Sequence, residues 1–378
     1  MRTGFNKLKT IIGFLSTVAL SLAACSSPAQ AATINFLGTL GGATSSADGI
    51  NASGQVVGQS PTTPFATHAF FYSNGSMTDL GALGSPGHSS YANSVNASGQ
   101  VAGYSTAASG ADHAFLDSGG IMTDLGTLGG TNSYGAGINA SGQVVGYSDI
   151  AGNPYHDAFL YSNGSMTDLG ALGGVSSLAY GINDSGQITG WAATAGDGAH
   201  AFLYTGGVMT DLGTLGSGYG SSSTGTAINA SGQIAGYSTI TGFGYTHAFL
   251  DKAGTMIDLG TLGGTTSYAF GINASGQVVG YSKTANGTVD AFLYSGGIMT
   301  DLNSFLPANS GWQLEQALGI NDAGQIVGVG ISGSTVRAFV LNTADSAAPE
   351  PTSAFLAVTG VALCLLFQRL RNIGEAKK

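Results

Sequence analysis

Histidine side chains recur at regular intervals along the chain, and histidine can bind metals or transfer protons. A metal site needs ligands that converge on one point, whereas copies of a repeated unit are spread through a structure. Other copies carry Asp157, Asp290 or Arg337 in place of the histidine, and an arginine would abolish a ligand. We therefore interpret the recurring histidines as structural side chains; they are His68, His113, His200 and His247.

Aspartates in a repeated Asp-Leu element are the candidates for calcium binding. Calcium takes several oxygen ligands from alternating positions of one loop, but here each aspartate stands alone at the end of an expected outer strand. A hydrogen bond to the backbone explains these aspartates better, and we predict no cofactor, since the spacing does not support calcium. The aspartates are Asp79, Asp124, Asp168, Asp211, Asp258 and Asp301.

Catalysis in a repeat protein needs residues that differ from copy to copy. Glu315 is the only glutamate between residues 34 and 343, and it lies near Trp312 in an unusual insertion at residues 303–321. Glycoside hydrolysis normally uses two carboxyl groups that flank the scissile bond, so a lone glutamate is weak support for an enzyme. We predict no catalytic residues, with a polysaccharide hydrolase or lyase as the alternative.

Aromatic residues that break the repeat are better candidates for binding. Trp191 stands where other copies carry tyrosine, and Tyr155 and Tyr245 lie in loops of variable length. Aromatic rings on such loops can stack on sugar rings, and variable loops are where repeat proteins place binding sites. Together with Trp312 these residues are the candidate ligand-binding set, although aromatics folded onto the repeated units are an equal alternative.

The charge of the body restricts its partners. Residues 32–344 contain three basic residues, namely Lys252, Lys283 and Arg337, and seventeen acidic ones, so the net charge is 3 − 17 = −14. This charge repels phosphate backbones and excludes nucleic acid, whereas a neutral sugar or a cation is a better match. Both cysteines, Cys25 and Cys364, lie in terminal apolar segments, so the body has no disulfide and no catalytic thiol.

Residues 1–31 are predicted to be a signal peptide for export. A basic start precedes an apolar run at residues 11–24, and Ala29 and Ala31 then provide the small residues that signal peptidase requires. The alternative is a lipoprotein, because Cys25 follows a Leu-Ala-Ala sequence and would be the lipidated residue.

The C-terminal end has three parts. A linker at residues 344–352 contains Pro349, Glu350 and Pro351, and an apolar helix with the basic residues Arg369 and Arg371 is expected over residues 353–372. Such a helix enters the membrane and leaves residues 373–378 in the cytoplasm. The order resembles the PEP-CTERM sorting signal, which implies an exosortase partner, transient membrane insertion, and transfer to the surface or extracellular matrix of a Gram-negative bacterium. A plain membrane anchor is the alternative.

The body repeats one unit seven times. An asparagine followed by a Gly-Gln pair recurs with spacings of 43 to 48 residues, and each copy also contains an Ala-Phe pair. Repeats of 40–50 residues with several short strands are typical of β-propellers. The asparagines are Asn51, Asn96, Asn139, Asn183, Asn229, Asn273 and Asn321.

One unit reads as four short strands. In the sixth copy, strands are expected at residues 268–273, 277–282 and 291–295, with a Met-Thr-Asp-Leu strand after them. An Asn-x-Ser-Gly turn joins the first two. In two other copies, Asn74-Gly75 and Asn163-Gly164 join the last two strands as hairpins.

The two ends of the body complete each other. Residues 34–42 match the fourth strand of the unit, which the last copy lacks. We therefore predict an all-β fold over residues 34–343, a seven-bladed β-propeller of four-stranded antiparallel blades, in which an N-terminal strand completes the last blade.

The His-Ala-Phe elements at His68, His113, His200 and His247 resemble the HAF repeat of bacterial extracellular proteins. The resemblance implies export and repetition and no defined activity. We predict an exported, non-enzymatic protein that binds or scaffolds surface polysaccharide or matrix components, with an adhesion protein for a protein partner as a further alternative.

Overall fold

The computed structural model describes residues 32–62, 66–84, 87–196, 198–218, 220–240 and 245–343. The predictions for the signal peptide, the sorting motif and the apolar C-terminal helix fall outside these residues. Across the described ranges, no helix has the length and apolar character needed to cross a membrane.

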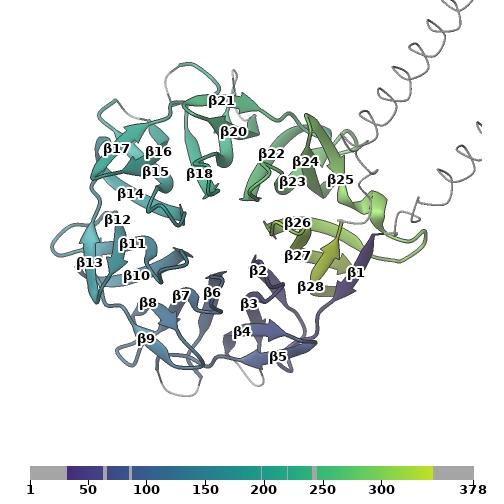
Figure 1. Cartoon of the computed structure of the whole chain (residues 1–378), viewed down its shortest axis with the longest axis horizontal. Coiled ribbons are helices and arrows are strands. Elements are labelled where there is room, and N and C mark those ends of the chain that lie inside the picture. The colour runs from purple at the N-terminus through teal and green to yellow at the C-terminus, as the bar shows by residue number, and fades with distance from the viewer. Residues whose placement is uncertain are drawn as a thin grey trace, which may run out of the picture. The chain divides into compact units, whose positions relative to one another are not determined.

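Residues Thr33–Asn342 form a compact unit of seven four-stranded antiparallel sheets arranged in a ring, as predicted (Figure 1). Blade 1 consists of β2 (Ser46–Ile50), β3 (Val56–Pro61), β4 (Thr67–Ser73) and β5 (Ser76–Asp79). Blade 2 consists of β6 (Ser90–Val95), β7 (Val101–Thr106), β8 (Asp112–Asp117) and β9 (Met122–Asp124). Blade 3 consists of β10 (Gly129–Ile138), β11 (Val144–Ile150), β12 (His156–Ser162) and β13 (Ser165–Asp168). Blades 4 and 5 consist of β14 (Gly173–Ile182), β15 (Ile188–Thr194), β16 (Ala199–Thr205) and β17 (Val208–Asp211); and β18 (Ser223–Ile228), β19 (Ile234–Thr239), β20 (Thr246–Lys252) and β21 (Thr255–Asp258). Blades 6 and 7 consist of β22 (Gly263–Ile272), β23 (Val278–Thr284), β24 (Val289–Ser295) and β25 (Ile298–Asp301); and β26 (Gln313–Ile320), β27 (Gln325–Ser332), β28 (Thr335–Asn342) and β1 (Thr33–Phe36).

The N-terminal strand closes the ring. β1 pairs antiparallel with β28, from Thr33 opposite Asn342 to Phe36 opposite Phe339. The ring of Phe36 also stacks on Trp312 with centroids 3.8 Å apart. The link into blade 7 contains the one helix among the described residues, the 3-10 helix η1 (Leu302–Phe305). The predicted closure is therefore confirmed.

The core lies between neighbouring blades. The phenylalanine of each Ala-Phe pair is fully buried. Six of the seven pack in a cluster with residues of the preceding blade, as Phe202 does with Val145. This shared burial stabilises the ring, because a buried phenylalanine contributes about 1.5–3 kcal/mol. The seven residues are Phe70, Phe115, Phe159, Phe202, Phe249, Phe292 and Phe339.

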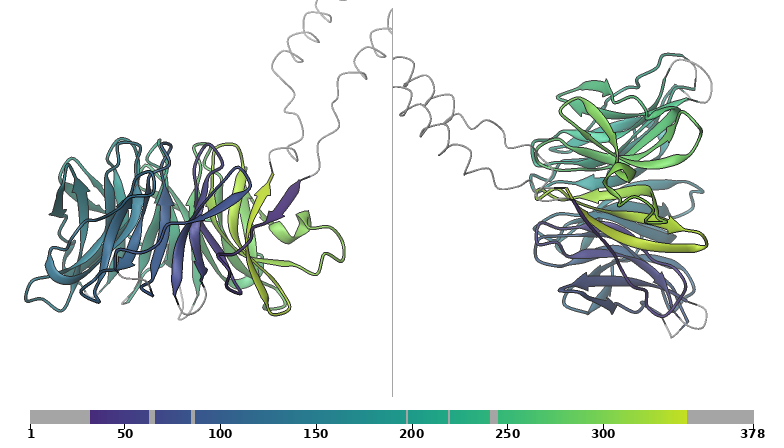
Figure 2. Two further views of the ribbon diagram at one scale, coloured as in Figure 1. Left: turned by 90° about the horizontal axis from the view of Figure 1, so that it is seen from below. Right: turned by 90° about the vertical axis from the view of Figure 1, so that its right-hand side faces the viewer.

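The blades have two ends. The asparagine turns and the third-to-fourth-strand hairpins lie at one end, which we call the turn face. The second-to-third-strand loops and the links between blades lie at the other end, the loop face, because successive strands run antiparallel (Figure 2). The turns have the predicted form: Gly142 has a φ of 77°, and its N–H donates to the Asn139 carbonyl at 3.0 Å.

Candidate functional site

The recurring asparagines form a hydrogen-bonded ring around the propeller axis. The side-chain Nδ2 of each donates to the backbone carbonyl of the asparagine in the next blade, at 2.9 to 3.3 Å. The last bond runs from Asn321 to Asn51 and closes the circle. The members are Asn51, Asn96, Asn139, Asn183, Asn229, Asn273 and Asn321.

Every hydrogen-bonding group of such an asparagine is occupied. In blade 4, Asn183 Nδ2 donates to Gln187 Oε1 at 2.8 Å and to the Asn229 carbonyl at 3.0 Å. Its Oδ1 accepts from the backbone N–H groups of Ser185 and Gln187. The side chain is buried, so the asparagine ring is structural and has nothing left to offer a ligand.

The motif histidines pair with the strand-end aspartates. In blade 1, His68 Nδ1 lies 2.8 and 2.9 Å from the two carboxylate oxygens of Asp79, eleven residues later. Asp79 also accepts from the Gly81 N–H at 2.7 Å, which is the backbone bond that the sequence predicted. The expectation that each aspartate stands alone is wrong in four blades, since the pairs are His68–Asp79, His113–Asp124, His200–Asp211 and His247–Asp258.

Blade 3 replaces this histidine–aspartate pair with two carboxyl groups. Asp157 occupies the histidine position, and burial raises its pKa to about 6, with further contributions from the charge of Asp168 and a hydrogen bond to it. In blade 6, burial also raises the pKa of Asp290, although its carboxylate accepts a hydrogen bond from Gln313 Nε2 at 2.8 Å.

We expect Asp157→His to raise the free energy of unfolding above pH 7 by about 1 kcal/mol, after allowance for solvent screening. The folded-state pKa of Asp157 lies above the value of 3.8 for a free aspartate, so wild-type stability falls as pH rises from about 4 through about 6. Histidine would remove this loss and restore the pairing with Asp168. Denaturant unfolding at pH 4 to 8 measures the effect. Asp290→His serves as the control and should gain less, because Gln313 already binds Asp290; equal gains would contradict the explanation.

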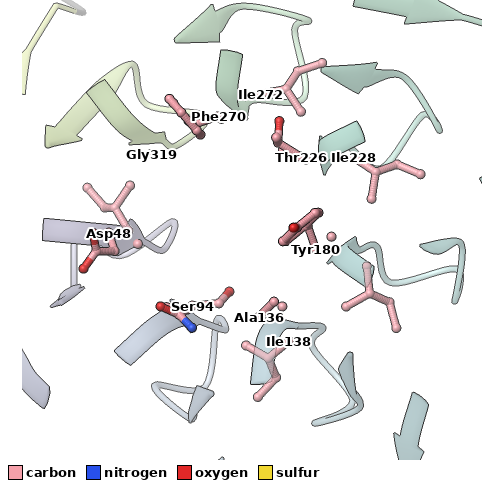
Figure 3. A pocket seen from close by; sticks show the side chains of 18 of the residues that line it. Asp48, Ser94, Ala136, Ile138, Tyr180, Thr226, Ile228, Phe270, Ile272 and Gly319 are labelled. Atoms are coloured by element: carbon pink, nitrogen blue, oxygen red, sulfur yellow. The ribbon is translucent and has the colours of Figure 1, made fainter. Parts of the chain in front are cut away.

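One position of the first strand faces the central channel and differs in every blade. The register between first and second strands shifts there; in blade 3, Gly135 pairs with Gly146 and Gly137 with Val145, which leaves Ala136 unpaired. Such bulges redirect a side chain, and here they direct it toward the channel (Figure 3). We call the residues at this position the channel ring; all of them except Leu318 line the cavity, and they are Asp48, Asn93, Ala136, Tyr180, Thr226, Phe270 and Leu318.

The channel ring has two chemically different sides. Asp48 and Asn93 are polar and belong to adjacent blades. Tyr180 lies across the channel from Asp48 (Figure 3), and Phe270 adds a second aromatic ring from blade 6. The cavity along the axis has a volume of about 230 Å³, and residues of all seven blades line it. Nothing else in the strands of this repetitive chain varies so completely, so the channel ring is a candidate site.

Two channel-ring side chains also form hydrogen bonds to the neighbouring blade. Asn93 Nδ2 donates to the Gly135 carbonyl of blade 3 at 2.7 Å, and Thr226 Oγ1 to the Ala269 carbonyl of blade 6 at 3.0 Å. Asp48 Oδ1 accepts from Ser46 Oγ at 3.0 Å. The residue keeps some contact with the channel, but its Oδ2 is enclosed without a hydrogen bond. Burial raises the pKa of Asp48 to about 7.

Partly buried aromatic rings extend from the channel across blades 2 to 6. Tyr104 and Tyr134 meet across a blade boundary with centroids 5.0 Å apart, and Tyr134 stacks on Tyr147 at 4.9 Å. Tyr147 contacts His156, the first residue of β12, which places these rings toward the loop face. We call the set the aromatic crescent: Tyr91, Tyr104, Tyr134, Tyr147, Tyr180, Trp191, Tyr237, Tyr268, Phe270 and Tyr281.

Blade 4 connects the two arms of the crescent to the channel. Trp191 lies on β15 and shares a side-chain hydrogen bond with Tyr180 on β14. Burial raises the pKa of Tyr180 to about 12, with smaller contributions from Tyr237 and Tyr147 on the flanking blades. Phe270 joins the other arm, 5.6 Å from Tyr281. The crescent and the channel ring therefore share Tyr180 and Phe270.

The structure separates the four predicted binding residues. Tyr155 and Tyr245 are 46% and 45% exposed on the loop face, where the sequence placed them. Trp191 lies on a strand within the crescent. Trp312 is partly buried against Phe36 at the ring closure, where the stack explains its presence without a ligand.

Glu315 lies at a second bulge of β26, between Leu314 and Gln316. In the described part of the chain, no hydrogen bond joins it to another carboxyl group, and no three potential metal ligands gather at one point. The sequence predicted neither the channel ring nor the histidine–aspartate pairing. A comparison of the seven copies shows that the channel-ring position varies, but not that it faces the axis. The joint absence of the histidine and the aspartate in blade 7 indicates the pairing.

Comparison with known proteins places the fold. No protein-family model matches the sequence, and no curated protein matches it either. The structure is similar to TolB from Acinetobacter baumannii, at 13% identity over 81% of this chain and 65% of that one, with a TM-score of 0.46. It is also similar to a prolyl endopeptidase (11% identity, 76% and 46% of the two chains, TM-score 0.50). A third likeness is to the Aleuria aurantia lectin, solved with Fucα1-6GlcNAc (15% identity, 68% and 96%, TM-score 0.36). The chain thus spans 65% of the TolB protein and under half of the endopeptidase, and these likenesses concern the propeller fold alone.

Proposed function

We propose that this protein is an exported, non-enzymatic propeller that binds surface or matrix polysaccharide through its loop face. The observation that carries the proposal is the aromatic crescent, whose partly exposed rings contact one another in blades 2 and 3 and again in blades 5 and 6. Aromatic faces give a sugar ring an apolar platform, and their edges carry hydroxyl groups for hydrogen bonds.

The charge of the body supports a neutral polymer. The net charge of −14 between residues 32 and 344 repels chains that carry carboxylate or phosphate groups. The resemblance to HAF repeats and to the PEP-CTERM signal supports delivery to the cell surface, where such polymers occur. The sorting enzyme would be an exosortase.

Binding to neutral exopolysaccharide tests the proposal. We expect wild-type protein to be captured on the immobilised polymer, and the double variant Tyr155→Ala, Tyr245→Ala to bind about tenfold more weakly, because an exposed stacking ring contributes about 1 kcal/mol or slightly less. Tyr134→Leu tests the crescent itself, and it should also weaken capture on the polymer because it removes one of the stacked rings.

The matched control is the double variant Ile121→Ala, Ile298→Ala. These side chains are 71% and 68% exposed in hairpins of the turn face, so they lose comparable apolar surface at the other end of the blades and should bind like wild type. Equal weakening in both double variants, or no capture of wild-type protein by any neutral envelope polymer, would overturn the proposal.

A further inference from the structure

The channel wall offers hydrogen-bonding groups that the protein does not use. Asn93 donates through Nδ2 to blade 3. Its Oδ1 accepts no hydrogen bond from the described residues and is not enclosed, and the residue lines the channel. Ser94 also lines the cavity, and its hydroxyl makes no hydrogen bond within the described residues. Tyr180 lines the cavity as well, and its hydroxyl donates no hydrogen bond within the described residues, so its proton is open to a ligand.

Apolar groups complete the lining. Phe270 and the ring of Tyr180 face the cavity from blades 6 and 4 (Figure 3). On the side of the asparagine turns, an apolar collar of one valine and six isoleucines follows the channel ring: Ile50, Val95, Ile138, Ile182, Ile228, Ile272 and Ile320. None of the described lining residues is basic, so a phosphate or sulfate group would find no counter-charge.

We propose that the channel ring binds one neutral pyranose residue, the end of a polysaccharide chain, with its apolar face toward Phe270 and its hydroxyl groups toward Asn93, Ser94 and Tyr180. Small-molecule sites usually combine an apolar or aromatic lining with a small number of polar groups that fix the ligand's orientation. The occupant is a chain end, because a polysaccharide that continued through the channel would have to enter the apolar collar. Its hydroxyl groups would lose their hydration there without gaining hydrogen-bond partners.

The proposal rests on the proposed function, because the crescent leads a bound chain to the channel through Tyr180 and Phe270. It adds a preference for chain ends over chain interiors. It also explains why the six channel-ring residues that line the cavity differ, since one asymmetric ligand on the axis of a ring needs a different contact from each of these blades.

Tryptophan fluorescence can report on the channel directly. The chain has two tryptophans, so a Trp312→Phe background leaves Trp191, whose partner Tyr180 lines the channel. The probes are methyl glycosides of glucose, galactose, mannose and N-acetylglucosamine, which represent chain ends. We expect a saturable change in fluorescence with at least one of them.

Three variants define the site. Ser94→Ala removes a hydroxyl without a protein hydrogen bond and should weaken binding about fivefold, and Phe270→Leu should weaken it about tenfold. Ala136→Phe gives blade 3 the side chain that blade 6 carries at the same bulge, so the fold should tolerate it while the cavity fills and binding is lost. Ile121→Ala, which removes an exposed side chain of the turn face, should bind the monosaccharide like the parent protein.

The outcomes separate the two proposals. If the protein captures the polymer but no monosaccharide changes its fluorescence, the channel site is overturned and polysaccharide binding stands. The same holds if the fluorescence change survives Ala136→Phe in a folded protein. A monosaccharide response that Ala136→Phe abolishes, without capture of polymer, supports the channel site and overturns the wider function. The absence of both overturns both.

Discussion

Asn183→Ala is expected to lower the free energy of unfolding by about 3 kcal/mol, because each buried polar group left without a partner costs about 1–3 kcal/mol. The change removes the donor to the Asn229 carbonyl and the acceptor of the Gln187 N–H in one step. Since the asparagine ring links every blade to the next, the variant should also lose cooperativity. Urea unfolding, followed by tyrosine fluorescence and by circular dichroism, measures both effects.

Asn163→Gly is the matched control for the asparagine ring. Asn163 is also a turn asparagine, but it is exposed and has a φ of 51°, a backbone conformation that glycine adopts without strain. We expect its effect on stability to stay within about 0.5 kcal/mol. Similar losses in the two variants would show that the asparagines act only within their own turns.

The sequence predicts the ring architecture well because the evidence for it is local and repeated. Each unit contains its own strands and turns, and the split unit at residues 34–42 shows how the ends meet. It does not predict what joins the blades. The turn alone explains an asparagine such as Asn321, and nothing within one unit reveals that its side chain reaches the carbonyl of Asn51, 270 residues away.

Parts of the candidate site could have been found from the repeat itself. Blade 7 carries Arg337 at the histidine position and Phe36 at the aspartate position, so the two residues are lost together, as expected for partners. The channel ring becomes visible only when the seven copies are compared and the bulge is known. Without the bulge, Ala136 would be placed on a blade face instead of the axis.

Asp48→Asn is expected to stabilise the protein at alkaline pH and to remove most of its pH dependence between about 4 and 7. Asp48 has a pKa of about 7 in the folded protein against 3.8 for a free aspartate, so the folded state binds more protons and wild-type stability falls as pH rises through this range. The shift corresponds to roughly 2–4 kcal/mol above pH 7. Unfolding in urea at pH 4, 6 and 8 measures the difference between the two proteins.

The reciprocal variant Asn93→Asp decides whether the channel-ring position itself causes the pH dependence of stability. Asn93 donates to the Gly135 carbonyl of the next blade, and the matching carbonyl for Asp48 is that of Ala92. A carboxyl group can donate to such a carbonyl only when it is protonated. Asparagine at position 48 should therefore supply the donor at every pH. Aspartate at position 93 should create a second loss of stability as pH rises. If Asn93→Asp leaves the pH profile unchanged while Asp48→Asn flattens it, the cause lies in the surroundings of Asp48, and proton-dependent bonding between blades is not a property of the channel ring.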